Sequence, residues 1–363
     1  MRKKTPTALR VLGYGALGTV VATAGFFVWF LRNDDQRNQT AVTTHDYAHI
    51  LRDNVPVNAN PRVVNVAMLG AHDAFSNEID PKSPLDPNSD TPILGNPLLK
   101  LLGGGVFARQ ARAQRSNAYE LAQRGVRLFD IRVTWDGTQW ANMHSFISGA
   151  FEPNLRHLLR FLHENPGEML LVDLQHVYPA PHTLDDLVTW IGTIREDGQS
   201  LWDFVHYDPN AIPLGKLRWR DVVPEGKAGA VVLLKKEQTP GCRYYYDDSV
   251  ATWHNEPDTQ TLLADIAAEY DRLRADPSNR QNGFSLNQAQ STPPLSLKAI
   301  AYWSLLKDAE TSNLAVLDHP DFDAWLRVMP QIWFNNTDSM VGDFNDRVVA
   351  RLNAYNQGIA MNN

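Results

Sequence analysis

The chain has 363 residues, of which 43% are hydrophobic and 21% charged, so a largely disordered protein is excluded and one large domain is within reach. The formal net charge is −7, and residues 1–37 hold six basic but only two acidic side chains, so the remainder is more acidic still. A general nucleic-acid binder is therefore excluded, because it needs a basic surface to contact phosphates.

The first predicted element is an apolar segment at 11–31, which carries no charged side chain and is long enough to cross a bilayer as a helix. Lysine and arginine are concentrated before it, so the positive-inside rule predicts a cytoplasmic basic segment at 1–10. We expect a single-pass membrane protein with a linker at 32–48 and one extracytoplasmic domain at 49–363. A signal peptide cleaved near 22–24 is the alternative.

Apolar runs and helical patterns alternate over the rest of the chain. The apolar runs predict buried strands at 63–68, 126–133, 169–174, 230–234, 284–286 and 332–334. The helical patterns lie at 117–124, 155–164, 184–195, 259–274 and 343–355. This alternation indicates a parallel sheet with helical crossovers. Because no glycine-rich phosphate loop is present, an α/β fold of the (β/α) TIM-type barrel class, complete or incomplete, is favoured over an open doubly wound sheet.

Two histidines and an arginine lie at or near the ends of predicted strands. His72 comes soon after the first strand, Arg132 lies in the second, and His144 follows twelve residues later. The carboxyl ends of parallel strands meet at the edge where barrel enzymes build their sites. One imidazole can take a proton from an attacking hydroxyl, the other can protonate a leaving oxygen, and the guanidinium can stabilise a phosphorane. The set therefore points to phosphodiester cleavage.

Ordinary structural roles compete with this interpretation. The chain has eleven histidines, and most histidines in proteins lie on the surface or make structural hydrogen bonds. Asp73 could simply cap the turn after the first strand, and Asp130 and Arg132 could form a buried ion pair. The lone Cys242 allows no internal disulfide and excludes a zinc site built on thiolates.

Four segments occur in a recognisable order. They are Gly-Ala-His-Asp at 70–73, Gly-Val-Arg-Leu-Phe-Asp-Ile-Arg at 125–132, His144, and Asn-Pro-Gly-Glu at 165–168. In order and spacing they resemble the X domain of phosphatidylinositol-specific phospholipases C, and most of all its bacterial branch. The match is dense over 63–175 and thinner afterwards. The resemblance implies a phospholipase C-like phosphodiesterase that acts on a phosphoinositol-type lipid or glycolipid.

The resemblance also implies a role for each matched residue. His72 would be the general base for the inositol 2-hydroxyl, giving a cyclic phosphate, and His144 the general acid for the diacylglycerol oxygen. Asp73 would orient the acid. Arg132 stands where calcium-dependent eukaryotic members have an acidic ligand, so no metal and no cofactor are expected. Calcium, with Asp130 as a ligand, is the alternative.

The chain departs from the family pattern at several positions. Ser145 follows His144 where glycine is usual, and Gln175 stands where bacterial members often have lysine. The carboxylate that supports the base near the last strand is expected at Asp338. Contacts with the head group are expected from Asp130, Gln175, Lys236 and Gln288.

Two other functions stay open. A catalytically silent barrel would bind a lipid or glycan head group without proton transfer, and the displaced Asp338 favours it. A metal-dependent phosphodiesterase would act on another diester and would be sensitive to chelators. The expected partners are a phospholipid or glycolipid substrate and the membrane, through the N-terminal helix. Trp135 and Trp140 flank the loop before His144, where they could contact a lipid interface or pack in the core.

Overall fold

The computed structural model describes residues 46–88, 108, 111–247, 249–278, 282–292, 305–335 and 344–359. These residues belong to the compact unit Val42–Asn363. The predicted segments 1–10 and 11–31 lie outside the described residues, and so does Asp338. In the part of the chain that is described, no helix has both the length and the apolar character needed to span a membrane.

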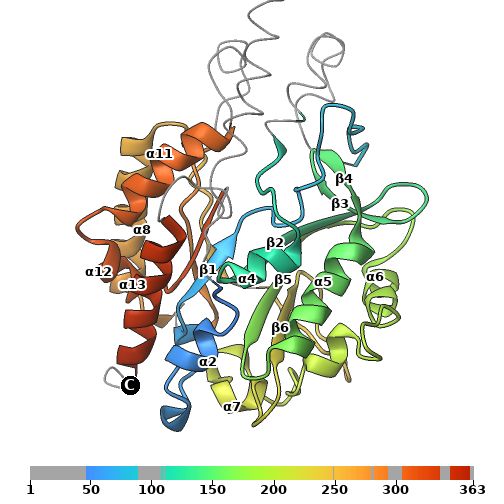
Figure 1. Ribbon diagram of the computed structural model, residues 1–363, viewed down its shortest axis with the longest axis horizontal. Coiled ribbons are helices and arrows are strands. Elements are labelled where there is room, and N and C mark those ends of the chain that lie inside the picture. Colours follow the sequence, from blue (N-terminus) through green and yellow to red (C-terminus); the bar gives the residue numbers. More distant parts are fainter. Residues whose placement is uncertain are drawn as a thin grey trace, which may run out of the picture. The chain divides into compact units, whose positions relative to one another are not determined.

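A sheet of mainly parallel strands organises this unit (Figure 1). Its strands follow the order β7-β6-β5-β2-β1-β10-β9-β8, and every neighbouring pair along this path is parallel. The bounds are β1 Met68–Ala71, β2 Val126–Trp135, β5 Met169–Tyr178, β6 Gly229–Leu234, β7 Tyr245–Tyr246, β8 Val250–Ala251, β9 Ser285–Gln288 and β10 Gln331–Phe334. No ladder joins β7 to β8 among the described residues, so the sheet is an incomplete barrel.

A hairpin extends β2. The strand β3 (Trp140–His144) pairs antiparallel with β2, and β4 (Phe146–Ala150) pairs antiparallel with β3. This hairpin was not predicted, because its residues mix polar and apolar types without a clear apolar run. The hairpin carries His144 back toward the ends of the parallel strands.

Helices flank the sheet in two groups. Figure 1 shows α8, α11, α12 and α13 on one side of β1, and α4, α5, α6 and α7 on the other. The helices are α2 Ile50–Asn54, α4 Ala118–Gln123, α5 Phe151–Glu164, α6 Leu184–Ile191, α7 Trp219–Val222, α8 Thr259–Ala275, α11 Leu305–Leu317, α12 Phe322–Leu326 and α13 Phe344–Gly358. Short 3-10 turns occupy Val57–Ala59, Val63–Asn65, Leu201–Phe204 and Leu214–Lys216.

Local sequence explains why the elements around the site begin and end where they do. The helix α4 begins at a capping box, in which the Asn117 side chain accepts from the Glu120 backbone while the Glu120 side chain accepts from the Asn117 backbone. In α5, apolar residues recur at helical spacing and are buried against the sheet. The helix ends at Glu164, with Asn165 as its C-cap just before Pro166, which cannot continue it.

The first strand differs from its prediction. Residues 63–68 were expected to form it, but Val63–Asn65 is a 3-10 turn and β1 begins only at Met68. The turn buries its valines as a strand would, so composition alone did not separate the two. Position 70 within β1 favours glycine, because a Cβ there would come within 2.7 Å of the Trp333 Cβ on the neighbouring strand β10. The strand ends at Ala71, directly before His72.

The other predicted strands are confirmed, with β2 and β5 longer than expected and β9 beginning one residue later and ending two residues later. The five predicted helices are also present, and α5 begins earlier than predicted. The predicted barrel class is confirmed in its incomplete form.

Candidate active site

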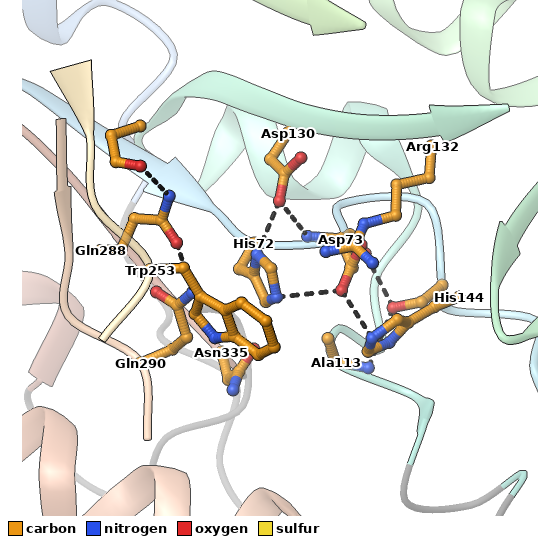
Figure 2. Close-up of polar contacts among 12 residues, drawn as sticks. His72, Asp73, Ala113, Asp130, Arg132, His144, Trp253, Gln288, Gln290 and Asn335 are labelled. Carbon is orange, nitrogen blue, oxygen red and sulfur yellow. Dashed lines mark hydrogen bonds and ion pairs between the residues drawn. The ribbon is translucent and has the colours of Figure 1, made fainter. Parts of the chain in front are cut away.

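His72, Asp73, Asp130, Arg132 and His144 meet at the carboxyl end of the parallel sheet (Figure 2). The first two follow β1, the next two lie on β2, and the last ends β3. The sequence placed four of the five in the catalytic set, and the structure brings all five together. We call them the histidine cluster.

His72 lies between two carboxylates. Its Nδ1 donates to Asp130 Oδ2 at 2.6 Å, and its Nε2 lies 3.0 Å from Asp73 Oδ2. The ring is only 8% exposed, and its burial opposes protonation. The charges of Asp73 and Asp130 outweigh that effect and raise the pKa of His72 to about 9. The imidazolium form is thus favoured at neutral pH.

Asp73 links both histidines to the arginine. Its Oδ2 lies 3.0 Å from Nε2 of His72 and 3.0 Å from Nε2 of His144, and its Oδ1 lies 2.5 Å from Arg132 Nε. Burial alone would raise the pKa of Asp73, but the surrounding cations, led by Arg132, hold it well below its usual range. Asp73 has φ +43°, a left-handed conformation that aspartate tolerates better than most residues. Its backbone N–H donates to Asp130 Oδ2 at 3.1 Å.

His144 has an oxygen acceptor at each ring nitrogen. Its Nδ1 donates to the Ala111 carbonyl at 2.7 Å, while its Nε2 faces Asp73. A doubly protonated ring can donate to both oxygens, which suits a group that gives up a proton. The next residue, Ser145, has φ +60°, which is why glycine is the expected residue there. Serine keeps the same turn at some conformational cost.

Arg132 and His144 remain accessible from the open end of the barrel. Their side chains are 23% and 22% exposed, so both can reach a ligand, whereas the Asp73 side chain is 1% exposed. Beneath these side chains, the Nε2 of Gln114 donates to the backbone carbonyls of His72 and Phe334, each at 2.9 Å. The backbone at the ends of β1 and β10 is thereby held in place.

Asp130 accepts from Nδ1 of His72, where the sequence had suggested Asp338 as the supporting carboxylate. Asp338 itself lies outside the described residues, so that prediction is not tested. Asp130 was expected to contact the head group or calcium instead. Its pairing with His72 depends on the parallel register of β1 and β2, in which Ala71 is opposite Phe129. The chain order alone does not reveal that register.

Three predicted head-group residues lie outside the histidine cluster. The β2–β5 register shifts after Ile131, so that Arg132 is opposite His176 and Gln175 becomes the extra residue of a bulge. Lys236 forms an ion pair with Asp185 at the start of α6. Gln288 is buried in β9, where its Nε2 donates to the Ala251 carbonyl at 3.0 Å.

Gln288 belongs to a group of neutral polar residues, which we call the amide wall: Trp253, Gln288, Gln290 and Asn335. Of these, only Gln288 was predicted from the sequence. Figure 2 shows these side chains across the site from Arg132 and His144. Gln290 Nε2 donates to Gln288 Oε1 at 3.1 Å. The acceptors Gln290 Oε1 and Asn335 Oδ1 are buried and have no partner among the described residues. Such acceptors can receive hydroxyl protons from a ligand.

Two further titratable residues were missed on β5. Asp173 is opposite Asp130 in the ladder, and both of its oxygens are buried without a hydrogen-bond partner among the described residues. Burial raises the pKa of Asp173 well above its usual value, and the charge of Asp130 contributes to the rise. Burial lowers the pKa of His176, and the neighbouring Arg132 lowers it further. The pairing of β5 with β2 would have identified both residues as neighbours of the cluster, because Asp173 is opposite Asp130 and His176 is opposite Arg132.

The spacing of the possible ligand atoms in the histidine cluster would by itself allow a metal ion to bind. Ligand atoms of His72, Asp73 and His144 lie within 4.8 Å of one another. Calcium, however, takes six to eight oxygen ligands, and this group offers one carboxylate and two ring nitrogens. The second oxygen of Asp73 is already paired with Arg132. The residues present therefore do not fit a calcium site.

Fold and site together define the phospholipase C-like barrel class. No model of a known protein family matches the chain. The PI-PLC X domain-containing protein 2 of Mus musculus is 28% identical over 123 residues, which is 33% of this chain and 36% of that protein. The variant-surface-glycoprotein phospholipase C of Trypanosoma cruzi is 27% identical over 157 residues, 41% of this chain and 40% of that one. The matches thus span well under half of these relatives.

Solved structures agree over a longer part of the chain. The phosphatidylinositol-specific phospholipase C of Listeria monocytogenes superposes with a TM-score of 0.52 at 15% identity, covering 84% of this chain and 98% of that one. A mutant of the Staphylococcus aureus enzyme superposes with a TM-score of 0.56 at 11% identity, covering 85% and 97%. These likenesses establish the fold. The curated relatives add a sequence similarity to PI-PLC X domain-containing proteins over about a third of the chain.

Proposed function

We propose that the protein is a phospholipase C-like phosphodiesterase that cleaves a phosphoinositol-type lipid through a cyclic phosphate, without a metal ion. One observation carries the proposal: a single carboxylate oxygen, Asp73 Oδ2, lies 3.0 Å from Nε2 of both His72 and His144. Two proton-transfer groups therefore face one small space, and Arg132 borders it. This is the arrangement that phosphodiester cleavage by paired acid and base requires.

The reaction proceeds by two proton transfers. His72 Nε2 takes the proton of the inositol 2-hydroxyl, whose oxygen attacks phosphorus as the bond to the diacylglycerol oxygen breaks. His144 gives its Nε2 proton to that leaving oxygen. Arg132 offers guanidinium N–H donors to the phosphoryl oxygens, where negative charge develops in the transition state. The products are a cyclic inositol phosphate and diacylglycerol.

The pKa of His72 sets the pH dependence of this scheme. With a pKa of about 9, only about 1% of His72 is neutral and able to act as a base at pH 7. We expect kcat/KM to rise with pH and to level off near that pKa. Substrate hydroxyls that displace Asp73 from Nε2 remove one of the contacts that favour the charged ring.

The amide wall supports a polyol head group. Gln290 Oε1 and Asn335 Oδ1 are buried acceptors that hydroxyl donors can satisfy. Inositol presents several hydroxyls besides the one that reacts. An unsubstituted or glycosylated inositol therefore matches this wall better than a head group without hydroxyl donors.

The test is product analysis by phosphorus NMR on the full chain. Phosphatidylinositol is supplied in mixed micelles, with and without EDTA, to wild type, His72→Ala and His144→Ala. His163→Ala is the matched control, because His163 lies exposed on α5 and contacts Gln199 instead of the cluster. We expect a cyclic inositol phosphate that forms despite EDTA, persists in the control and falls by roughly 10³-fold or more in both cluster variants.

Other outcomes would select the alternatives. Turnover that EDTA abolishes would indicate a metal-dependent phosphodiesterase. Binding of inositol phosphate without turnover of any diester would indicate a catalytically silent barrel. Loss of activity in His163→Ala as well would contradict the assignment of the site.

Membrane attachment forms a separate part of the proposal. The apolar segment 11–31 would anchor the protein with 1–10 in the cytoplasm and the barrel outside, close to its lipid substrate. Fusion of reporter domains to each end of the chain tests this topology. A reporter that is active in the cytoplasm at the C-terminus would contradict it.

A further inference from the structure

A second cavity lies away from the histidine cluster, beside the turn of the β2–β3 hairpin and the first half of α5. Its volume is about 630 Å³, which is within the range of small-molecule sites. None of the cluster residues lines it. Trp135 borders it and lies three residues beyond Arg132, about 10 Å along β2. The cavity is therefore separate from the candidate active site.

Three tryptophans form the apolar part of the lining. Trp135 and Trp140 are opposite each other in the β2–β3 ladder, with ring centroids 5.5 Å apart and planes at 78°. Trp190 of α6 borders the cavity as well and stacks on Phe151. The two hairpin indoles make a rigid corner. The face of an indole carries negative charge density and attracts the weakly positive C–H bonds of a ring packed on it.

Charged residues on α5 and beyond it form the polar part. Arg156 pairs with Glu152 at 2.8 Å and with Glu196 at 3.4 Å. His157 also borders the cavity, and its Nδ1 is buried without a partner among the described residues. Burial lowers the pKa of His157, which favours the neutral ring at pH 7. The cavity thus offers donors and acceptors in addition to aromatic faces.

The composition of the lining limits the class of ligand. Seven of the twelve lining residues are polar or charged, so an acyl chain would leave polar groups without partners. The two carboxylates are matched by two guanidinium groups, those of Arg156 and Arg160, so neither a phosphate nor a quaternary ammonium group meets an excess of opposite charge. A neutral ring with hydroxyls at its edge and C–H bonds on its face suits both parts.

We propose that this cavity, bounded by Trp135, Trp140, Trp190 and the Glu152–Arg156 pair, is a binding site for a neutral saccharide. The sugar face packs on an indole, and its hydroxyls bond with the charged pair and with His157. The site does not depend on phosphodiesterase activity. It would let the protein hold a glycan next to the surface that carries the reaction site.

The test measures binding and does not involve hydrolysis. The full chain, in a polyoxyethylene detergent without sugar or choline groups, is examined by saturation-transfer NMR. The probes are the methyl glycosides of glucose, galactose, mannose and N-acetylglucosamine, with phosphocholine and inorganic phosphate as charged comparators. Two variants alter the cavity: Trp135→Ala removes an aromatic face, and Gln139→Trp fills the space from an exposed position, where folding is easily preserved.

Tyr246→Ala is the matched control. Tyr246 is an exposed aromatic side chain, at 51%, and it does not line the cavity. We expect at least one glycoside to bind, the two cavity variants to weaken binding by roughly tenfold or more, and the control to leave binding unchanged. The proposal is overturned if no glycoside binds, if the cavity variants leave binding unaltered, or if they abolish binding of phosphocholine instead.

Discussion

The two sides of the candidate active site satisfy their polar groups in different ways. On the side of β1, β2 and β3, the charged groups pair with one another: both ring nitrogens of His72 face carboxylates, and Asp73 is shared with Arg132 and His144. On the side of β9 and β10, the side chains are neutral, and buried acceptors such as Asn335 Oδ1 have no partner among the described residues.

The difference separates preorganisation from recognition. Charged groups that pair with one another need no reorganisation when charge moves in the transition state, so they suit proton transfer and phosphate stabilisation. Neutral acceptors without partners gain hydrogen bonds only when a ligand arrives, so they suit binding of hydroxyls. Substitutions on the charged side should therefore alter kcat, and those on the neutral side should alter KM.

The largest effect among these tests is expected for Arg132→Lys. Lysine keeps the positive charge but loses the planar fork that holds Asp73 Oδ1 at 2.5 Å while presenting further N–H donors to phosphate. We expect kcat to fall by roughly 100-fold with little change in KM. Steady-state kinetics on phosphatidylinositol micelles measures both.

Arg272→Lys is the control for that substitution. Arg272 pairs with Glu269 on the surface of α8, so the same chemical change should leave kcat within about twofold. A large rise in KM with kcat unchanged in Arg132→Lys would assign the arginine to ground-state binding and weaken the comparison.

The next effect concerns the pH profile of Asp130→Asn. The charge of Asp130 helps to raise the pKa of His72 to about 9, against the effect of burial. Without that charge the pKa of His72 falls toward its usual value near 6.5, so the base becomes neutral at lower pH. We expect the rising limb of kcat/KM to move to lower pH. The maximal rate should fall by about tenfold, because a neutral amide oxygen is a weaker acceptor for the Nδ1 proton than a carboxylate and orients the ring less firmly.

An unchanged position of that limb in Asp130→Asn would show that His72 is not the base. Asp186→Asn serves as the control, because the exposed Asp186 carboxylate accepts from the Thr183 backbone at the start of α6, and its histidine neighbour is His182 rather than a cluster residue. Its profile should match that of wild type.

The charged side was also the side that the sequence could predict. His72, Asp73, Arg132 and His144 lie in short motifs within or close behind apolar runs, and such runs indicate strands even where they misplace the ends. The barrel class followed from the same alternation of strands and helices. The role of Asp130 did not, because the contact with His72 depends on which residues of two strands lie side by side.

The neutral side gave no comparable signal. Glutamine and asparagine near a strand end occur on many surfaces, and only the order β1-β10-β9 places Asn335 and Gln290 beside His72. The sequence also could not show whether Gln175 or His176 lies beside Arg132. A bulge between β2 and β5 decides which of them is opposite Arg132, and bulges leave no mark in an apolar pattern.

A smaller effect is expected for Asn335→Leu and Gln290→Leu. Each replaces a buried amide by an apolar side chain, so a substrate hydroxyl loses one partner. One such hydrogen bond contributes about 0.5–1.5 kcal/mol, so KM should rise by roughly 2- to 10-fold with kcat preserved. Kinetics against soluble inositol cyclic phosphate separates this effect from micelle binding. Gln357→Leu, at an exposed site on α13, should change neither value.

The smallest effect is expected at Asp173, where the predicted change is in stability. Asp173 is an acidic residue like those of the charged side, but it does not pair with a cation in the described part of the chain. Both oxygens are buried without hydrogen bonds among the described residues, and burial raises the pKa of the carboxyl well above its usual value. The unfolded chain therefore ionises at lower pH than the folded one. The stability associated with this group is complete below about pH 4 and is lost as pH rises through the raised pKa.

Asp173→Asn cannot ionise, so it should remove that loss of stability. We expect its free energy of unfolding to exceed that of wild type by on the order of 2 kcal/mol at pH 8, and the difference to vanish near pH 4. Urea titrations at the two pH values measure it, with the exposed Asp321→Asn as the control. Equal stability at pH 8 would mean that Asp173 is ionised and paired when folded. Because its charge would then face Asp130 directly across the β2–β5 ladder, the charged side would extend one strand further than the histidine cluster.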